Sequence, residues 1–335
     1  MNKKAFEFSF GWLFALLVGA VILFLAIYAL SNIVNNLRLQ KETETGKDIG
    51  TIFSPVETTL ENAKYSELAV KQPTVLFNDC EISGSFGSQL ISTKIKSSIG
   101  SSWREGETIP SAFHNKYLFS ESELPAEDNF YIISKPFEFP FKIADIMIMW
   151  SDQASYCFVD LSSAPGEIGG LSAEFSNLLV NITNVESASA CPANSRKVCH
   201  ENNANQCSSK DIIIYQNSVK KEEQELYYLL SPNDDNPYPL LLAAIFSNKT
   251  IYDCQVQRLM MRANNLAKTY QEKASALSRI DSSCSFSSEL TSPLASYLSK
   301  TRDLVINKDL SLLPSIKSEA INIQNENDVL LCRLF

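Results

Sequence analysis

Residues 8–30 read FSFGWLFALLVGAVILFLAIYAL, and no charged side chain lies between Glu7 and Arg38. At about 1.5 Å of rise per residue, this run matches the roughly 30 Å hydrocarbon core of a bilayer, whereas the apolar part of a secretory signal is only about 7–15 residues long. The run therefore predicts a transmembrane helix over residues 8–31, after a short tail over residues 1–7. It indicates where the remaining chain lies but not what that chain does.

Removal of the run as a signal peptide is one alternative. Cleavage requires small residues one and three positions before the cut. A cut after Ala29 would place Ile27 at the third position, and a cut after Ala26 would fall inside the run. We therefore expect the helix to be retained.

A prepilin-type leader is a second alternative. The sequence KKAF at residues 3–6 places a small residue after two basic ones and before an aromatic residue, and in part it resembles the leaders of type IV pilins. Those pilins carry a glutamate five residues into the mature chain, whereas this sequence has Phe10 there and Glu7 at the second position. A pilin-like filament subunit stays an alternative function.

The orientation of the helix follows from cysteines rather than from charge. Basic residues flank the run on both sides and acidic ones count little in the positive-inside rule; the basic ones are Lys3, Lys4, Arg38, Lys41 and Lys47. The eight cysteines all follow the run: Cys80, Cys157, Cys191, Cys199, Cys207, Cys254, Cys284 and Cys332. Such an even set is typical of disulfides in an oxidising compartment. Sequons at Asn181 and Asn248 agree if they are exposed. We expect a cytoplasmic N-terminus, with the bulk of the chain extracytoplasmic.

One cysteine pairing can be argued against. Apolar residues recur at helical spacing over residues 251–279, which predicts an amphipathic helix. Its polar face carries Arg258, Arg262, Lys268 and Lys273. The ends of that helix are about 40 Å apart, whereas a disulfide needs Cα atoms within about 7 Å, so Cys254 and Cys284 do not pair. We expect Cys284 to bond Cys332. The pairings left open are those of Cys80, Cys157, Cys254, Cys191, Cys199 and Cys207.

Metal binding by the cysteines is less well supported. Zinc ligands usually come in close pairs, and neither CxxC nor HxxxH occurs; the two histidines are His114 and His200. Cys191, Cys199 and Cys207 recur every eight residues, but the polar segments between them are typical of loops closed by disulfides. We expect no metal and no cofactor.

The composition is that of a globular protein, with 45% hydrophobic and 20% charged residues. After residue 32 the chain holds 27 basic and 37 acidic side chains. This acidic balance, without a cluster of lysine and arginine, argues against nucleic acid as a partner.

The pattern beyond the anchor predicts an α+β fold with a mixed or antiparallel sheet. We expect a helical stalk over residues 32–71, an α+β domain over residues 72–236 and a helical region over residues 237–335 packed on it. Predicted strands cover residues 74–82, 86–95, 129–134, 155–161, 211–216 and 225–230, with a helix over residues 165–180. Pro293 and Pro314 are expected to break or start helices. Three aromatic residues on one face of an extended segment predict core or membrane-proximal packing: Phe137, Phe139 and Phe141.

Motifs that could carry chemistry are weak. The glycines at residues 84–87 and 166–170 lack the spacing of phosphate-binding loops, and we expect turns there. No GxSxG motif occurs, and His114 has no nucleophile signature beside it. Asp152 and Asp160 could form a carboxylate pair, although acids at strand ends are usually solvated. No catalytic residue is predicted.

Small residues recur every four positions in the anchor, at Gly11, Ala15 and Gly19. Such a stripe allows another membrane helix to approach closely. Trp12 and Tyr28 lie near the two ends of the run, where interfacial aromatics anchor a span. We expect the bilayer and another membrane helix, from a second copy or a different protein, as partners.

Several stretches together resemble a group of uncharacterised single-span, cysteine-containing surface proteins of small-genome archaea. They are the opening KKAFEFSFGWLFALLVGAVILFLAIYA, the segments YIISKPFEFPFKIADIM, SYCFVDL and LLAAIFSNKTIYDCQVQRLM, and a final CRLF. The resemblance implies a surface-facing, disulfide-containing protein of an archaeal membrane, and it implies no activity and no site residues.

The sequence as a whole predicts a membrane-anchored, extracytoplasmic structural or interaction protein of the cell surface that is not an enzyme. The alternatives are the pilin-like subunit and an extracytoplasmic enzyme or solute-binding subunit. The last of these requires a deep pocket in which polar groups converge.

Overall fold

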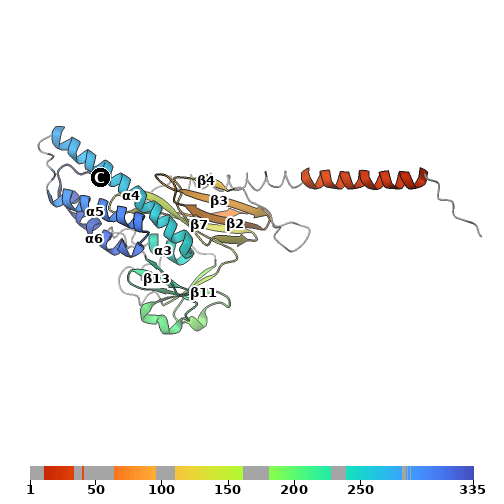
Figure 1. Ribbon diagram of the computed structural model, residues 1–335. Coiled ribbons are helices and arrows are strands. Elements are labelled where there is room, and N and C mark those ends of the chain that lie inside the picture. Colours follow the sequence, from red (N-terminus) through yellow and green to blue (C-terminus); the bar gives the residue numbers. More distant parts are fainter. Residues whose placement is uncertain are drawn as a thin grey trace, which may run out of the picture.

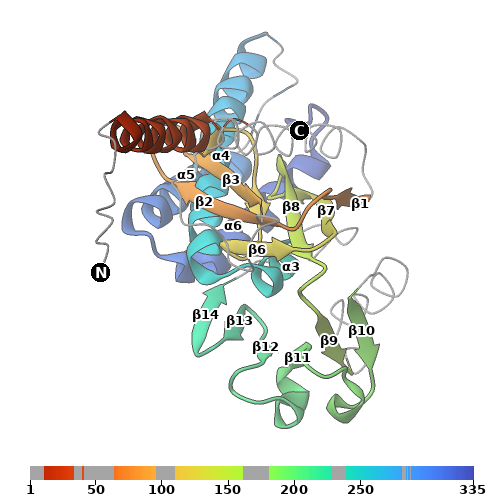
Figure 2. The same ribbon diagram turned by 90° about the vertical axis from the view of Figure 1, so that its right-hand side faces the viewer.

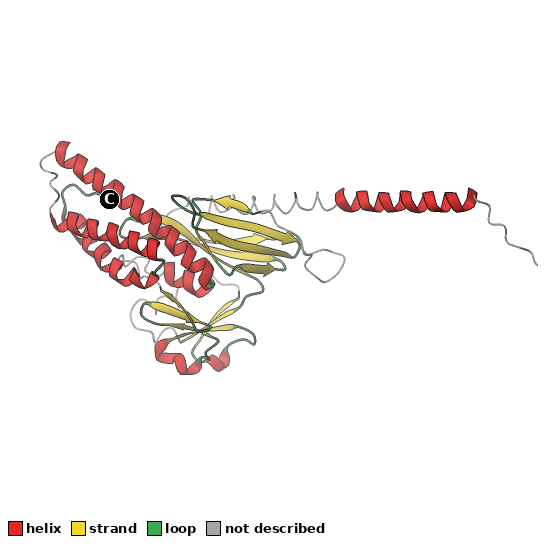
Figure 3. Cartoon of the chain, viewed as in Figure 1, coloured by secondary structure: helices red, strands yellow, loops and turns green. Residues whose placement is uncertain are grey.

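The computed structural model describes residues 11–33, 40, 64–95, 110–160, 181–227, 239–280, 284, 286 and 288–335. The fold is α+β with mixed sheets, as the sequence predicts. Residues Gly11–Ile33 form one apolar helix that is long enough to cross a membrane and is not buried against the rest of the protein. Figure 1 shows this helix in red, and Figure 3 shows the strands and the helices of the last third.

Two four-stranded sheets pack face to face. Sheet one has the order β1 (Lys64–Ala69), β7 (Asn129–Glu138), β8 (Lys142–Ser151) and β5 (Leu118–Phe119). Sheet two has the order β4 (Ser111–Phe113), β3 (Ser88–Ile95), β2 (Thr74–Glu81) and β6 (Glu123–Ala126). The longest strands, β7 and β8, form an antiparallel hairpin at the centre of sheet one (Figures 1 and 2). Its tight turn contains a cis peptide bond between Phe139 and Pro140.

Sheet one is buried on both faces. Alternate side chains of a strand point to opposite faces, and in β7 and β8 both sets are apolar. One set packs against sheet two, through Phe130, Ile132, Met147, Met149, Leu76, Ile91 and Leu124. The other set packs against the helices, through Tyr131, Ile133, Phe137, Ile146, Ile148 and Trp150. The hairpin therefore belongs to both cores of the protein.

The third sheet is built from the middle of the chain. Its order is β10 (Ile182–Val185), β9 (Tyr156–Val159), β11 (Arg196–His200), β12 (Ile212–Ile214), β13 (Ser218–Lys221) and β14 (Gln224–Tyr227). The first four strands are parallel, and the last two continue antiparallel. Two disulfides lie in this part, Cys157–Cys191 and Cys199–Cys207. Figure 2 shows these strands as a separate group below the other two sheets.

Four helices follow the sheets. They are α3 (Pro239–Phe246), α4 (Lys249–Ile280), α5 (Ser288–Asn307) and α6 (Leu313–Val329). All eight residues of α3 are buried, and α4 confirms the helix predicted over residues 251–279. Phe141 of the β7–β8 turn packs against Tyr270 of α4, with ring centroids 4.7 Å apart, and against Tyr297 of α5. Phe137, Phe139 and Phe141 are all buried, which confirms their predicted place in the core.

Some expectations were wrong in the described part of the chain. The helical stalk over residues 32–71 cannot extend to its predicted end, because Lys64–Ala69 form β1 and pair along their whole length with β7. Tyr65 stacks on Tyr131, with ring centroids 6.2 Å apart, so tertiary packing overrides the helical pattern there. The strand β8 was missed because its near-continuous apolar sequence lacks the alternation of a half-exposed strand.

The position of Pro293 is another correction. It lies inside α5 rather than at its start, since one proline near a helix N-terminus removes only one backbone hydrogen bond. Pro314 does lie in the first turn of α6. Stalk residues 34–39 and 41–63, the helix expected over residues 165–180 and the glycines at residues 166–170 lie outside the described residues.

Candidate functional site

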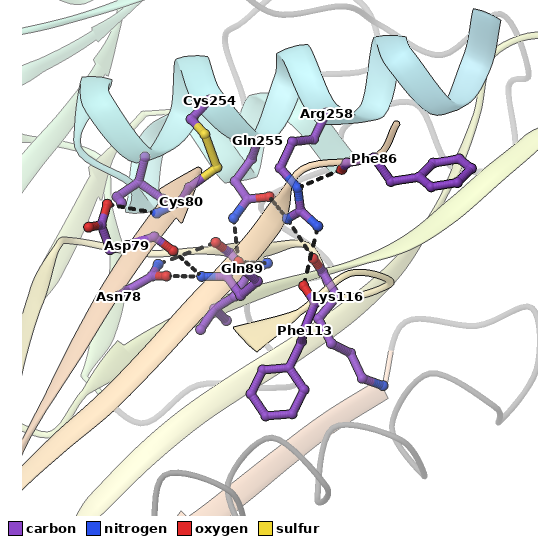
Figure 4. The surroundings of a disulfide bond; sticks show 12 residues. Asn78, Asp79, Cys80, Phe86, Gln89, Phe113, Lys116, Cys254, Gln255 and Arg258 are labelled. Carbon is purple, nitrogen blue, oxygen red and sulfur yellow. Dashed lines mark hydrogen bonds between the residues drawn. A yellow bond between two sulfur atoms is a disulfide. The ribbon is translucent and has the colours of Figure 1, made fainter. Parts of the chain in front are cut away.

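The strongest concentration of buried polar side chains lies where α4 crosses sheet two (Figure 4). Asn78 of β2, Gln89 of β3, and Gln255 and Arg258 of α4 are each 2% exposed or less. Gln255 Nε2 donates to Gln89 Oε1, and Gln89 Nε2 donates to Asn78 Oδ1. Asn78 Nδ2 continues the chain of hydrogen bonds to Ser120 Oγ at 2.7 Å. The network joins the helix to two strands of the sheet.

Arg258 is the only ionised member of this network. Its guanidinium donates to the carbonyl oxygens of Phe86 at 3.1 Å, Lys116 at 2.8 Å and His114 at 3.0 Å, and to Gln255 Oε1 at 2.7 Å. No carboxylate among the described residues faces it; its charge is offset by these oxygen atoms and by the Tyr117 ring, whose centroid is 4.7 Å away. Burial lowers the pKa of Arg258 to about 10, so the group stays charged at neutral pH.

This position of Arg258 corrects the sequence-based expectation, which placed it on the polar face of the helix. The first half of α4 is buried nearly all round, including Gln255 and Gln257, so a polar residue there needs partners inside the protein. The sequence contained part of the information needed to predict this burial. Gln255 and Arg258 stand among the apolar residues Val256, Leu259 and Met260, which leave no exposed stripe at that level of the helix.

The disulfide Cys80–Cys254 lies beside the network and links the end of β2 to the second turn of α4. Its Cα atoms are 6.1 Å apart, and it settles one pairing that the sequence left open. Cys284 bonds Cys332, as predicted, and Cys254 does not bond Cys284. The remaining pairs are Cys157–Cys191 and Cys199–Cys207, so all eight cysteines are bonded.

A second charged cluster joins the third sheet to the other two. Glu121, between β5 and β6, accepts from Arg196 of β11 at 2.5 Å and from Lys221 of β13 at 3.3 Å. Lys221 Nζ also donates to the carbonyl oxygens of Ile245 and Ser247, at 3.0 and 2.7 Å. This lysine therefore connects the third sheet to the C-terminal end of α3, where a cation is favoured.

Burial and charge act in opposite directions within this cluster. Burial raises the pKa of Glu121, but Lys221 and Arg196 outweigh it, so the pKa of this carboxyl lies below its usual range. Burial also lowers the pKa of Lys221, against the attraction of Glu121 and with the help of Arg196. Glu121 thus holds two cations in place while it remains ionised.

The described surface includes two open hollows of different size. The larger, of about 320 Å³, is lined by Asn115, Lys142, Ile143, Ala144, Asp145 and Arg262. The smaller, of about 210 Å³, lies between α4, α5 and the β2–β3 turn, and Arg302 and Ile306 line it. Neither includes a residue of the Arg258 network or of the Glu121 cluster, whose polar groups bind one another and backbone carbonyls.

The predicted candidates for chemistry occupy structural positions. Asp152 accepts from the backbone N–H groups of Glu127, Asp128 and Asn129, at 3.0, 2.6 and 2.9 Å. Burial raises its pKa, but these hydrogen bonds outweigh it and the net shift is downward. Asp160 accepts from Asn203 Nδ2 at 3.1 Å. Each carboxylate thus stabilises a different loop.

The histidines and glycines also occupy structural positions. His114 is exposed, with Nδ1 3.1 Å from the Gly87 carbonyl oxygen, whereas His200 is buried and caps the turn that follows it. Residues 84–86 form the predicted turn between β2 and β3. Within the described ranges, no three His, Cys, Asp or Glu side chains gather as a metal site would require.

The two sequons differ in how their amides are used. Asn181 Nδ2 donates to the Asp152 carbonyl oxygen at 2.8 Å, and Asn248 Oδ1 accepts from Ile251 N at the start of α4. Both side chains are half-buried. Glycosylation of either stays a prediction, as does packing of another helix on Gly11, Ala15 and Gly19, which are exposed here.

Comparisons of the chain with protein-family models, curated proteins and solved structures found no match. An N-terminal apolar helix and four disulfides are compatible with a secreted or membrane-anchored extracellular protein.

Gly87 gives a direct test of how tightly the Arg258 network is packed. Gly84 and Gly87 both have positive φ, at 67° and 61°, but a Cβ on Gly87 would lie 2.5 Å from the Glu81 carbonyl oxygen, whereas nothing lies within 4 Å of one on Gly84. Gly84→Ala should cost about 1 kcal/mol of unfolding free energy through backbone strain. Gly87→Ala should cost at least about 2 kcal/mol more, as overpacking does. Thermal unfolding of the full chain in detergent micelles measures both, and equal losses would contradict the close packing.

Glu121 predicts a pH dependence. A carboxyl whose pKa is lowered in the folded state contributes stability that is present above its unfolded pKa of about 4.3 and is lost as the pH falls through the lower folded value. Glu121→Gln should therefore lose less stability than the wild type between neutral and acidic pH, and it should be less stable at pH 7. Urea unfolding across this range measures the difference, with Glu123→Gln at an exposed position as the matched control. An unchanged pH profile in Glu121→Gln would refute the role assigned to this carboxylate.

Proposed function

We propose that this chain is a membrane-anchored, extracytoplasmic structural or interaction protein of the cell surface and that it is not an enzyme. The observation that carries the proposal is the combination, in one chain, of an unburied apolar helix and four disulfides that all lie after it. The helix Gly11–Ile33 leaves its apolar surface for lipid or for another helix.

The placement of the disulfides supports an extracytoplasmic ectodomain. Two of them join segments far apart in sequence, Cys80 to Cys254 and Cys284 to Cys332, and two close the loops of the third sheet. Such bonds persist in oxidising compartments and are rare in a reducing cytosol. In the proposed topology the N-terminus is cytoplasmic and everything after the anchor is outside.

A non-catalytic role agrees with how the buried polar groups are used. Arg258 binds backbone carbonyls of the loops beside sheet two, and Glu121 binds two cations that join the third sheet to its neighbours. Both clusters stabilise the arrangement of sheets and helices. A rigid, acidic, disulfide-bonded domain held at a membrane is suited to contacts with other surface components.

Protease protection tests the topology. Protease added to intact cells should digest the chain after the anchor, while an epitope tag fused ahead of residue 1 stays protected until the membrane is permeabilised. A membrane-impermeant maleimide should label no cysteine before reduction. Cleavage of the tag in intact cells would contradict the orientation, free thiols would contradict the compartment, and release of the ectodomain into the medium would contradict the retained anchor.

We further propose that the anchor contacts another membrane helix through Gly11, Ala15 and Gly19. Small residues let two helix backbones approach closely in lipid. Gly11→Leu with Gly19→Leu should therefore weaken crosslinked complexes in native membranes by about tenfold, since close helix packing contributes on the order of 1–2 kcal/mol. Ala20→Leu is the matched control, because Ala20 lies on nearly the opposite side of the helix at 100° per residue. Unchanged complexes in the double variant would exclude this face.

A further inference from the structure

One part of the lining of the larger hollow is a loop that is hydrogen-bonded to Arg258. Asn115, on the loop after β4, lies between His114 and Lys116, whose carbonyl oxygens both accept from the Arg258 guanidinium. The start of β8 also lines the hollow, and there Lys142 Nζ pairs with Asp145 Oδ1 at 3.0 Å. Arg262 of α4, one helical turn after Arg258, completes the lining. The polar groups of this hollow are thus set on a helix, a strand and a clamped loop.

Arg262 differs from Arg258 in having its guanidinium available. Among the described residues, no hydrogen bond or ion pair engages the Arg262 side chain, which is half-exposed. Lys142 and Asp145 neutralise each other, so the described lining of the hollow carries one further positive charge, that of Arg262. A planar guanidinium in such a hollow is suited to bind a carboxylate through two parallel hydrogen bonds, and the Asn115 amide of the same lining adds a further donor.

The Asp145 carboxylate restricts what the anion can be. It lines the same hollow. Lys142 balances its charge, but its oxygens only accept hydrogen bonds, so they favour ligands with hydroxyl donors over sulfate or phosphate, whose oxygens also only accept. A volume of about 320 Å³ is at the low end of small-molecule sites. We propose that this hollow binds a small hydroxylated monocarboxylate, with Arg262 and Asn115 on the carboxylate and Asp145 on a hydroxyl group.

This proposal goes beyond the anchoring role and does not depend on it, because every residue of the hollow follows the anchor and the site would exist in either membrane orientation. Hydroxylated carboxylates come from two sources, acidic sugars of surface polysaccharides and free hydroxy acids. Glucuronate represents the first source and lactate the second. Glucose has the sugar ring without the carboxylate, and sulfate has the charge without hydroxyl donors.

Ligand-observed NMR titration of the full chain in detergent micelles tests the site with these four probes. We expect saturable binding of glucuronate, of lactate or of both, in the millimolar range, and weaker binding of glucose and sulfate. Arg262→Gln should weaken carboxylate binding at least about tenfold, as loss of a charged hydrogen-bonding partner does. Arg262→Lys should recover part of it, because the charge returns without the planar fork. Arg302→Gln, at the exposed arginine of the smaller hollow, is the matched control and should bind as the wild type does.

The variant Asp145→Asn tests whether Asp145 selects for a hydroxyl group on the ligand. It should raise the affinity for sulfate, since it leaves the Lys142 ammonium without its carboxylate partner. It should lower the affinity for the hydroxylated carboxylate, since it removes a strong acceptor. Binding that is absent for both carboxylates, that is matched by glucose, or that survives Arg262→Gln would overturn the proposal. A wild-type preference for sulfate would overturn the assigned ligand class. Failure of the topology experiment would leave all of these results unchanged, so the two proposals fail separately.

Discussion

The hairpin of β7 and β8 lies between two apolar layers, and most of the architecture follows from that double burial. Its side chains alternate toward sheet two and toward the helices, and both sets are apolar. A sheet with two apolar faces must be covered on both sides. Sheet two covers one face and the C-terminal helices cover the other, so segments that lie far apart in the sequence meet at the same two strands.

The helix α4 then connects the helical layer to sheet two. Its first half is buried and carries the disulfide to Cys80, the amide contacts to sheet two and the Arg258 guanidinium that binds three loop carbonyls. A disulfide restricts the unfolded chain, whereas a buried arginine contributes only while each of its donors is satisfied. The covalent bond and the hydrogen-bonded network thus act on the same contact by different means. The same clamp holds the loop that bears Asn115 and so shapes the proposed carboxylate site.

The third sheet shares the main apolar core with sheet one and the helices, and a charged cluster adds a second attachment. Glu121 accepts from one cation of β11 and one of β13, and Lys221 reaches the end of α3. Because the charged attachment depends on one carboxylate, its strength varies with pH. The strength of the apolar contacts does not. The third sheet is therefore held by apolar contacts that do not depend on pH and by a charged cluster that does.

The sequence by itself determined the properties that depend on local pattern. The charge-free run, the amphipathic helix over residues 251–279, the α+β class and the pairing of Cys284 with Cys332 follow from composition, periodicity and the reach of a helix. The tertiary structure alone decided β1 and β8, whose patterns are overridden by burial against a neighbouring strand and two apolar layers. It also decided the other three disulfides and the burial of Arg258, since these depend on which strands a helix crosses. The proposed site likewise depends on the tertiary structure, because Asn115, Asp145 and Arg262 lie on three separate segments that only the folded chain brings together.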